Sequence, residues 1–109
     1  MSVQLKPFVK VPDTVKKGKA FEIRTRLPHE METGLRTDDE GNIIPRKIIN
    51  KFVCKYNGEQ VFSADLHPAI SAHPYLAFYT VATESGTLEF LWTDDDGTIY
   101  TATVSVAVE

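Results

Sequence analysis

Cys54 is the single cysteine of the sequence and therefore its one candidate nucleophilic thiol. A reactive thiol needs solvent access and a lowered pKa, which a helix N-terminus or a nearby cation supplies. Cys54 lies instead within an alternating run, on the same face as Phe52 and Tyr56. We interpret it as a buried small hydrophobe, with a contact to a partner, a disulfide to a partner and a catalytic thiol as alternatives.

His29, His67 and His73 are the candidate metal ligands. Zinc sites usually contain closely spaced histidine pairs or paired cysteines. His67 and His73 are six positions apart with Pro68 between them, which is poor spacing for a shared metal. We therefore expect hydrogen-bonded loop histidines, no metal site and no cofactor.

A run of three aspartates at residues 94–96, followed by Gly97, superficially resembles part of a calcium loop. An EF-hand needs alternating ligands between two helices, whereas this run lies between expected strands. It predicts a hairpin turn with a positive φ at Gly97, and residues 38–42 predict a turn containing Gly41. The sequence contains no phosphate-binding loop, dinucleotide fingerprint, nucleophile elbow or HExxH motif. We therefore expect a non-catalytic domain.

The elements that position these residues are short apolar runs of period two, separated by turn signals. This pattern predicts an all-β fold, an immunoglobulin-like antiparallel β-sandwich of about seven strands in one domain over residues 1–109. Asn57 and Gly58 predict a type I′ hairpin turn. The expected strands are residues 5–11, 20–27, 47–56, 60–64, 75–82, 87–93 and 98–108.

The outward faces of three expected strands differ in character. In residues 20–27, apolar side chains alternate with Glu22, Arg24 and Arg26, which places a charged face outward. Residues 75–79 and 88–92 carry large apolar side chains on both faces instead. Apolar surface outside a core often marks a partner interface, and the alternative is that loops cover it.

The composition of the 109 residues, 42% hydrophobic and 25% charged, is that of an ordinary soluble globular chain. The formal net charge is −3 and there is no basic stripe, which argues against nucleic acid as a partner. No window approaches the ~18 apolar residues of a membrane-spanning helix. The beginning of the sequence lacks the order of a secretory signal, which by itself predicts a cytoplasmic protein or export by another route.

A long connection separates the strand that ends near Leu27 from the strand that begins near Lys47, about twenty residues later. Connections of that length are uncommon in compact domains and are usually functional or disordered. Ile43 and Ile44 occur there close to Arg46. Such a combination suits a protein interface with apolar anchors and charged donors at its edge.

Segments throughout the chain match the pattern of one protein family in their order and spacing. They are residues 9–12, 17–18, 31–34, 44–50, 52–54, 56–58, 61–66, 68–72, 74–76 and 92–97. In these segments the chain resembles the SoxZ family, the small subunits of thiosulfate-oxidation carrier complexes. No single segment is a chemical signature, and the specificity lies in their combination.

The resemblance implies that the chain pairs with a SoxY-like subunit in a heterodimer and has no turnover of its own. In that family, SoxY ends in a flexible glycine-rich arm whose cysteine carries sulfur intermediates covalently to other sulfur-oxidation enzymes, which contact the complex transiently. The resemblance also implies a periplasmic location, reached by co-export with the signal-bearing partner. The alternatives are a stand-alone sandwich module that binds another protein, and a small enzyme that uses Cys54.

Under this resemblance we expect residues 31–50 and 69–75 to contact SoxY or a visiting enzyme. Arg46 and Lys47 would attract anionic sulfur groups such as a sulfonate, through Coulomb forces of only a few kcal/mol at ~4 Å. No catalytic residue is predicted. The predicted interface residues are Met31, Glu32, Arg36, Ile44, Pro45, Arg46, Lys47, Ile48, Ile49, Ile70, Pro74 and Tyr75.

Overall fold

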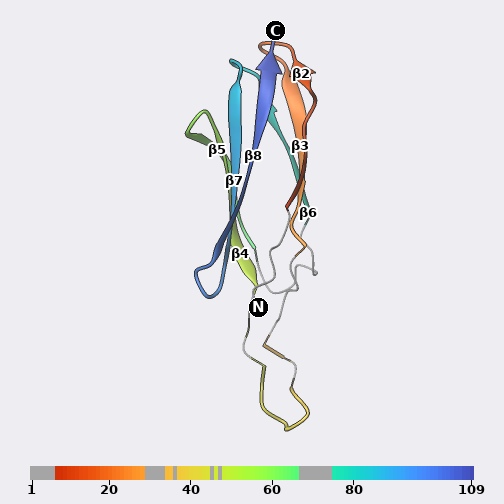
Figure 1. The fold of residues 1–109 in the computed structure, drawn as a ribbon, viewed down its shortest axis with the longest axis vertical. Helices are drawn as coiled ribbons and strands as arrows, with labels where there is room; N and C mark the ends of the chain where they lie inside the picture. The colour runs from red at the N-terminus through yellow and green to blue at the C-terminus, as the bar shows by residue number, and fades with distance from the viewer. Residues whose placement is uncertain (1–6, 29–33, 36, 45, 47, 67–74) are drawn as a thin grey trace.

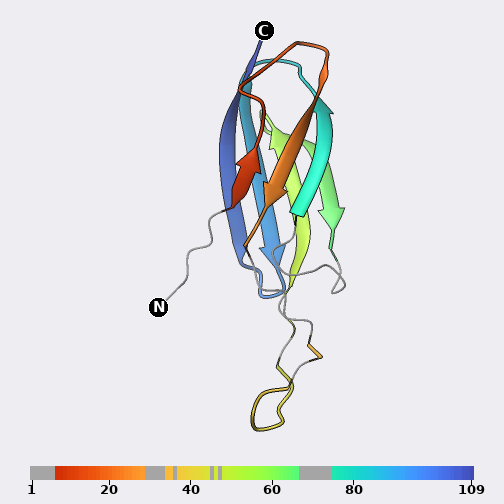
Figure 2. The same ribbon diagram turned by 90° about the vertical axis from the view of Figure 1, so that its right-hand side faces the viewer.

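The structure is a computed structural model that describes residues 7–28, 34–35, 37–44, 46, 48–66 and 75–109. In these residues, eight strands form two sheets that pack face to face (Figures 1 and 2). The predicted all-β, immunoglobulin-like sandwich is confirmed. The strands are β1 (Phe8–Lys10), β2 (Thr14–Val15), β3 (Ala20–Arg26), β4 (Ile49–Tyr56), β5 (Glu59–Asp65), β6 (Tyr75–Val81), β7 (Gly86–Asp94) and β8 (Ile99–Val108).

One sheet has three strands in the order β1-β3-β6, and the other has five in the order β2-β8-β7-β4-β5. The named strands pair antiparallel, apart from β2 and β8, which run parallel with Val15 opposite Val108. Of the eight strands, β2 is the one that the sequence pattern did not predict, because two residues are too few to show a period. No helix in the described part of the chain is long and apolar enough to cross a membrane.

The core lies between the two sheets and is centred on Phe52 of β4. Its ring centroid lies 5.2 Å from that of Trp92 and 6.3 Å from that of Phe90, both on β7. It also lies 5.8 Å from the ring of Phe78, on β6 of the other sheet. Because these side chains occupy alternate, inward positions of their strands, one aromatic cluster joins the two sheets.

The start of β4 departs from strict alternation. Its register against β7 shifts between Ile49 and Lys51. The shift turns Ile49 inward together with Phe52, and Ile48, one residue before the strand, is buried as well. Two consecutive isoleucines are therefore buried at the end of the five-stranded sheet, where the long connection ends.

The predicted turns are confirmed. Asn57 and Gly58 both have positive φ, 49° and 83°, as a type I′ turn between β4 and β5 requires. Gly97 has φ 88°, and its N–H donates to the carbonyl of Asp94 at 3.0 Å. The turn between β7 and β8 lies at the end of the sandwich from which the long connection emerges (Figure 1).

Candidate partner interface

The described parts of the long connection form a paired, hairpin-like extension. Thr37 pairs with Ile43 through an antiparallel bridge. A Cβ placed on Gly34 would lie 3.2 Å from the Cβ of Arg46. Gly34 precedes Thr37 by three residues and Arg46 follows Ile43 by three, so both contacts fit one antiparallel register. Residues 37–44, drawn in yellow, project beyond the end of the sandwich (Figures 1 and 2).

Asp38 closes the tip of this extension. Its Oδ1 accepts hydrogen bonds from the N–H groups of Glu40 at 2.9 Å and Asn42 at 3.0 Å. Gly41 has φ 82°, a conformation that residues with a Cβ rarely adopt. The turn predicted over residues 38–42 is confirmed, and the side chain of Asp38 holds it together with backbone hydrogen bonds.

Asp95 attaches the base of the extension to the turn between β7 and β8. Its carboxylate accepts two hydrogen bonds from the Arg46 guanidinium, at 2.8 Å from Nε and 3.0 Å from Nη2. It also accepts from the Ile48 N–H at 3.2 Å and from Asn50 Nδ2 at 3.0 Å. A bidentate arginine–carboxylate pair fixes both distance and orientation. The base of the extension at Arg46 is therefore held against the end of the five-stranded sheet.

The surroundings of Asp95 favour its charged form. Partial burial, which leaves 14% of the side chain exposed, acts in the opposite direction and raises the pKa. The hydrogen bonds from Asn50, Arg46 and the Ile48 N–H, with the positive charge of Arg46, outweigh burial and lower the pKa of Asp95. The carboxylate is therefore ionised at neutral pH and balances the charge of Arg46.

Asp94 turns the other way and caps the turn from inside. It is 1% exposed, and its Oδ1 accepts from the N–H groups of Asp96 and Thr98, each at 3.1 Å. Its Oδ2 accepts from the Tyr100 hydroxyl at 3.1 Å. The sequence predicted the turn but not the anchoring role of Asp95. One signal in the sequence could have pointed to that role. A turn of this kind favours an aspartate at its first position, so two of the three aspartates at residues 94–96 are more than the turn needs.

The predicted interface residues fall into three groups. Arg46 and Tyr75 are exposed and Ile44 is half-buried, whereas Ile48 and Ile49 are buried inside the domain. A partner at this end would meet the backbone of the last two rather than their side chains. The assignment of an interface here stays a prediction. Met31, Glu32, Arg36, Pro45, Lys47, Ile70 and Pro74 lie outside the described residues.

The extension can present apolar surface more readily than charge. Leu35 and Ile43 are 88% and 70% exposed. Arg46 is already paired with Asp95, so it attracts an anionic sulfur group less than a free arginine would. Ile43 had a signal in the sequence, its place beside Ile44, but Leu35 had none, because single exposed leucines are common.

Cys54 is fully buried among the core residues of the five-stranded sheet. Burial disfavours the thiolate and raises the pKa of Cys54 to about 12. At neutral pH the group is a protonated thiol without solvent access, which confirms the interpretation of a buried small hydrophobe. It lacks both properties that a nucleophilic cysteine needs.

The described residues contain no group of three or more histidine, cysteine, aspartate or glutamate side chains placed to hold a metal ion. His29, His67 and His73 lie outside the described residues, so their predicted role as loop histidines stays a prediction.

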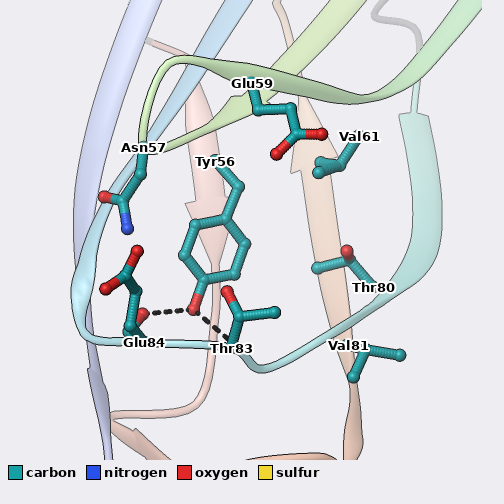
Figure 3. Close-up of a pocket in the computed structure, with 8 residues that line it drawn as sticks. All are labelled: Tyr56, Asn57, Glu59, Val61, Thr80, Val81, Thr83 and Glu84. Atoms are coloured by element: carbon teal, nitrogen blue, oxygen red, sulfur yellow. Dashed lines mark hydrogen bonds between the residues drawn. The ribbon is translucent and has the colours of Figure 1, made fainter.

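A hollow lies beside the turn between β4 and β5 (Figure 3). Tyr56 donates a hydrogen bond to the carbonyl of Glu84 and accepts one from the Thr83 N–H at 3.4 Å, which ties the β6–β7 connection to β4. Its lining contains two carboxylates but no histidine, cysteine or cation that would form a nucleophile–base pair. The lining residues are Tyr56, Asn57, Glu59, Val61, Thr80, Val81, Thr83 and Glu84.

Comparison with known families bears on the alternatives left open by the geometry. The family described as "Sulphur oxidation protein SoxZ" matches residues 9–105, most of the chain. This chain belongs to the SoxZ family. Membership confirms the resemblance in the sequence and gives the chain a role in sulfur oxidation. Among curated proteins, no sequence matches this SoxZ-family chain.

Solved structures of three kinds share the fold of this SoxZ-family chain. A superoxide reductase (neelaredoxin) from Ignicoccus hospitalis matches with a TM-score of 0.74 and 19% identity, over 94% of this chain and 80% of that one. The sulfur carrier protein SoxY from Chlorobium limicola f. thiosulfatophilum matches with a TM-score of 0.62 and 15% identity, over 94% and 78%. The CARDB domain of a Pyrococcus furiosus protein matches with a TM-score of 0.53 and 18% identity, over 96% and 95%. These identities show a common sandwich and carry no chemistry from one protein to another.

Proposed function

We propose that this chain is the non-catalytic subunit of a SoxYZ sulfur-carrier heterodimer in thiosulfate oxidation. In this proposal a SoxY-like subunit provides the cysteine-bearing arm on which sulfur intermediates are carried covalently. The SoxZ-family chain supports that subunit and shapes the surface on which the arm and the visiting enzymes dock. The family match over residues 9–105 supports the pairing.

The observation that carries the proposal is the state of Cys54. A carrier of covalent sulfur needs an accessible thiol that forms a thiolate. The single cysteine of this chain is fully buried, and burial raises its pKa to about 12. Sulfur chemistry in the complex therefore needs a thiol from another chain, which is the role proposed for SoxY.

The described part of the extension, residues 34–35, 37–44 and 46, is the proposed docking element for the arm or for visiting enzymes. Its base is held by the Arg46–Asp95 pair and its tip by Asp38, so it presents Leu35 and Ile43 from a preformed shape. A preformed surface loses less conformational entropy on binding than a flexible loop. That suits an element that must meet several enzymes in turn.

We also propose a periplasmic location, reached together with a signal-bearing SoxY-like subunit. The family resemblance supports this. Cell fractionation with and without the signal of the partner tests it: the chain should appear in the periplasm only when the partner keeps its signal. A periplasmic chain without that signal would contradict co-export.

The experiment that tests the proposed function is co-expression with the SoxY-like subunit of the same organism, followed by size exclusion and intact mass measurement. After incubation with thiosulfate and the oxidising enzymes of the pathway, we expect a one-to-one complex with sulfur-derived mass on the partner alone. The Cys54→Ala variant is the control and should load the partner equally. A lone monomer, or an adduct on this chain, would contradict the proposal.

Alkylation of Cys54 distinguishes the carrier subunit from a small enzyme that uses this thiol. At a pKa of about 12, the thiolate fraction near pH 8 is about a thousand-fold smaller than for a thiol whose pKa is 9.0. We expect iodoacetamide to label Cys54 in urea but not in the native protein over the same time. Rapid native labelling would instead favour the enzyme.

A further inference from the structure

The outer face of the three-stranded sheet brings together side chains that are far apart in the sequence. The register places Phe8 of β1, Arg26 of β3 and Tyr75 of β6 in one row across the sheet. Arg24 lies in the next row, and Tyr79 lies opposite Glu22 in the one after. We call this surface the tyrosine–arginine face. It comprises Phe8, Arg24, Arg26, Tyr75, Tyr79 and Val81.

Large apolar groups on this face are open to solvent. Phe8 is 53% exposed, Tyr75 55%, Tyr79 66% and Val81 51%. Single exposed apolar residues are ordinary, but these four lie on β1 and β6, the two strands that flank β3 in one small sheet. Tyrosine and arginine are also the residue types that most often dominate binding energy at protein interfaces.

The face is positively charged on a chain that is acidic overall. Lys10 and Glu22 also lie on this side of the sheet, so its strands carry three cations and one carboxylate, while the whole chain has a formal net charge of −3. Glu22 accepts a hydrogen bond from Arg24, and the pKa of Arg24 is raised, first by that bond and less by Tyr75 and Tyr79. No described residue forms an ion pair with Lys10 or Arg26. The complementary surface is therefore one that carries carboxylates.

The face ends at β6, which is an edge strand among the described residues. β6 pairs with β3 along one edge, and no described strand pairs with its other edge. Its seven residues include no charged side chain and no proline. Natural proteins blunt free edges with charges, prolines or a covering element, so an uncharged edge of this length beside an aromatic face indicates that something covers both.

A second copy of this chain is a poor candidate for that cover. A twofold-symmetric contact would set the same positive face against itself, because both partners use the same patch. Like charges brought together in an interface are unfavourable. A different protein, with carboxylates around an apolar centre, satisfies both the charge and the exposed rings.

We propose that the tyrosine–arginine face is the surface on which the SoxY-like subunit docks, with its carboxylates against Arg24 and Arg26 and apolar side chains against Phe8, Tyr75 and Tyr79. This inference rests on the proposed function, since it takes the partner from it. It leaves the extension over residues 34–46 free for the arm and for visiting enzymes. The stable interface and the transient one then lie on different parts of the molecule.

The test is biolayer interferometry with the SoxY-like subunit immobilised and the full chain in solution. Tyr75→Ala with Tyr79→Ala should weaken binding by at least roughly thirty-fold, the loss expected from one interface hot spot. Arg24→Gln with Arg26→Gln should lower the association rate about ten-fold at low salt and less at high salt. Lys51→Gln with Lys55→Gln is the matched control and should stay within about two-fold of the wild type.

The control removes the same charge from the outer face of the other sheet, so a general charge effect would move both arginine and lysine variants alike. Circular dichroism melting of each variant shows whether it is folded, and the arginine variants test the face even if the tyrosine variants unfold. Wild-type binding that survives both the tyrosine and arginine changes overturns this inference and leaves the proposed function standing. Equal losses in the lysine variants also overturn it. A wild-type chain that does not bind the subunit contradicts the proposed function itself.

Discussion

The two outer faces of the sandwich differ although the two sheets share one core. On the five-stranded sheet, Lys51 lies opposite Asp65 and Lys55 opposite Glu89, so cations face carboxylates on neighbouring strands. β8 adds a row of alternating hydroxyl side chains at residues 101, 103 and 105. On the three-stranded sheet, the corresponding positions hold exposed rings with Arg24, which pairs with Glu22, and Arg26, which forms no ion pair with a described residue.

The difference shows which outer face has the polarity that a sandwich fold needs and which does not. A sandwich needs one apolar face on each sheet, and a polar outer face that water can solvate completes it. The five-stranded sheet follows that rule more closely, since opposite charges lie in register across its strands, although Val61 and Ile99 are exposed on it. The three-stranded sheet departs further from it, as the proposed docking of a partner on this face predicts.

The largest expected effect comes from the core beneath both faces. Phe52→Ala should destabilise the domain by about 3–5 kcal/mol, because it removes the ring that contacts Phe78 on one sheet and Trp92 on the other. Urea unfolding of the full chain measures the change. Both outer faces should be lost in one transition.

Val53→Ala is the matched control for this prediction. Val53 is the next residue on β4 and lies half-buried on the outward side, so we expect a loss of only about 0.5–1.5 kcal/mol. Equal losses at the two positions would show that Phe52 does not join the sheets. Two separate unfolding transitions in the wild type would show the same.

Much of this fold is predictable because it follows from period-two patterning and turn chemistry. The alternation of Phe21 and Ile23 with Glu22 and Arg24 set the inward and outward sides of β3, and the asparagine–glycine turn fixed the hairpin that follows β4. The pattern could not predict β2, which has two residues, or the register shift near Ile49. A shift depends on how two strands meet, and neither strand carries that information alone.

The next largest effect concerns the end of the five-stranded sheet, where Asp95 anchors the extension, rather than its outer face. Asp95→Asn should cost about 1–2 kcal/mol at pH 7, because it removes the charge that Arg46, Asn50 and the Ile48 N–H are arranged to meet. Asp39→Asn, an exposed aspartate at the tip of the extension, is the control and should change stability little. A control loss as large as that of Asp95→Asn would mean that the anchor contributes nothing specific.

The pH dependence of this effect has a definite sign. The pKa of Asp95 is lowered in the folded protein, so its contribution is fully present above the unfolded pKa of about 3.9 and is lost as pH falls through the folded value. The gap in urea midpoint between wild type and Asp95→Asn should therefore be constant from pH 7 to about pH 5 and shrink at lower pH. A gap that widens on acidification would mean that the carboxylate is not stabilised in its charged form.

The candidate sites were less predictable than the fold, and for a physical reason. The tyrosines of β6 and the arginines of β3 were each visible as outward residues, but only the sheet register places Tyr75 beside Arg26. Likewise, Arg46 and Asp95 are 49 positions apart, and nothing local links them. Interfaces and anchors arise from contacts between distant segments, whereas strands arise from neighbours.

The smallest effect tests whether the two outer faces are equal in folding while they differ in binding. Tyr79→Ala on one face and Thr103→Ala on the other should each change the free energy of unfolding by no more than about 0.5 kcal/mol, because both side chains are exposed. Thermal melting of the free chain measures this, and the same variants can be compared in the binding assay. If Tyr79→Ala were to lower stability by more than about 1.5 kcal/mol, the tyrosine would belong to the packing of the free chain, and its exposure would no longer point to a partner. A near-zero change in stability with a large loss of binding can arise only if the ring is held on the surface for another molecule.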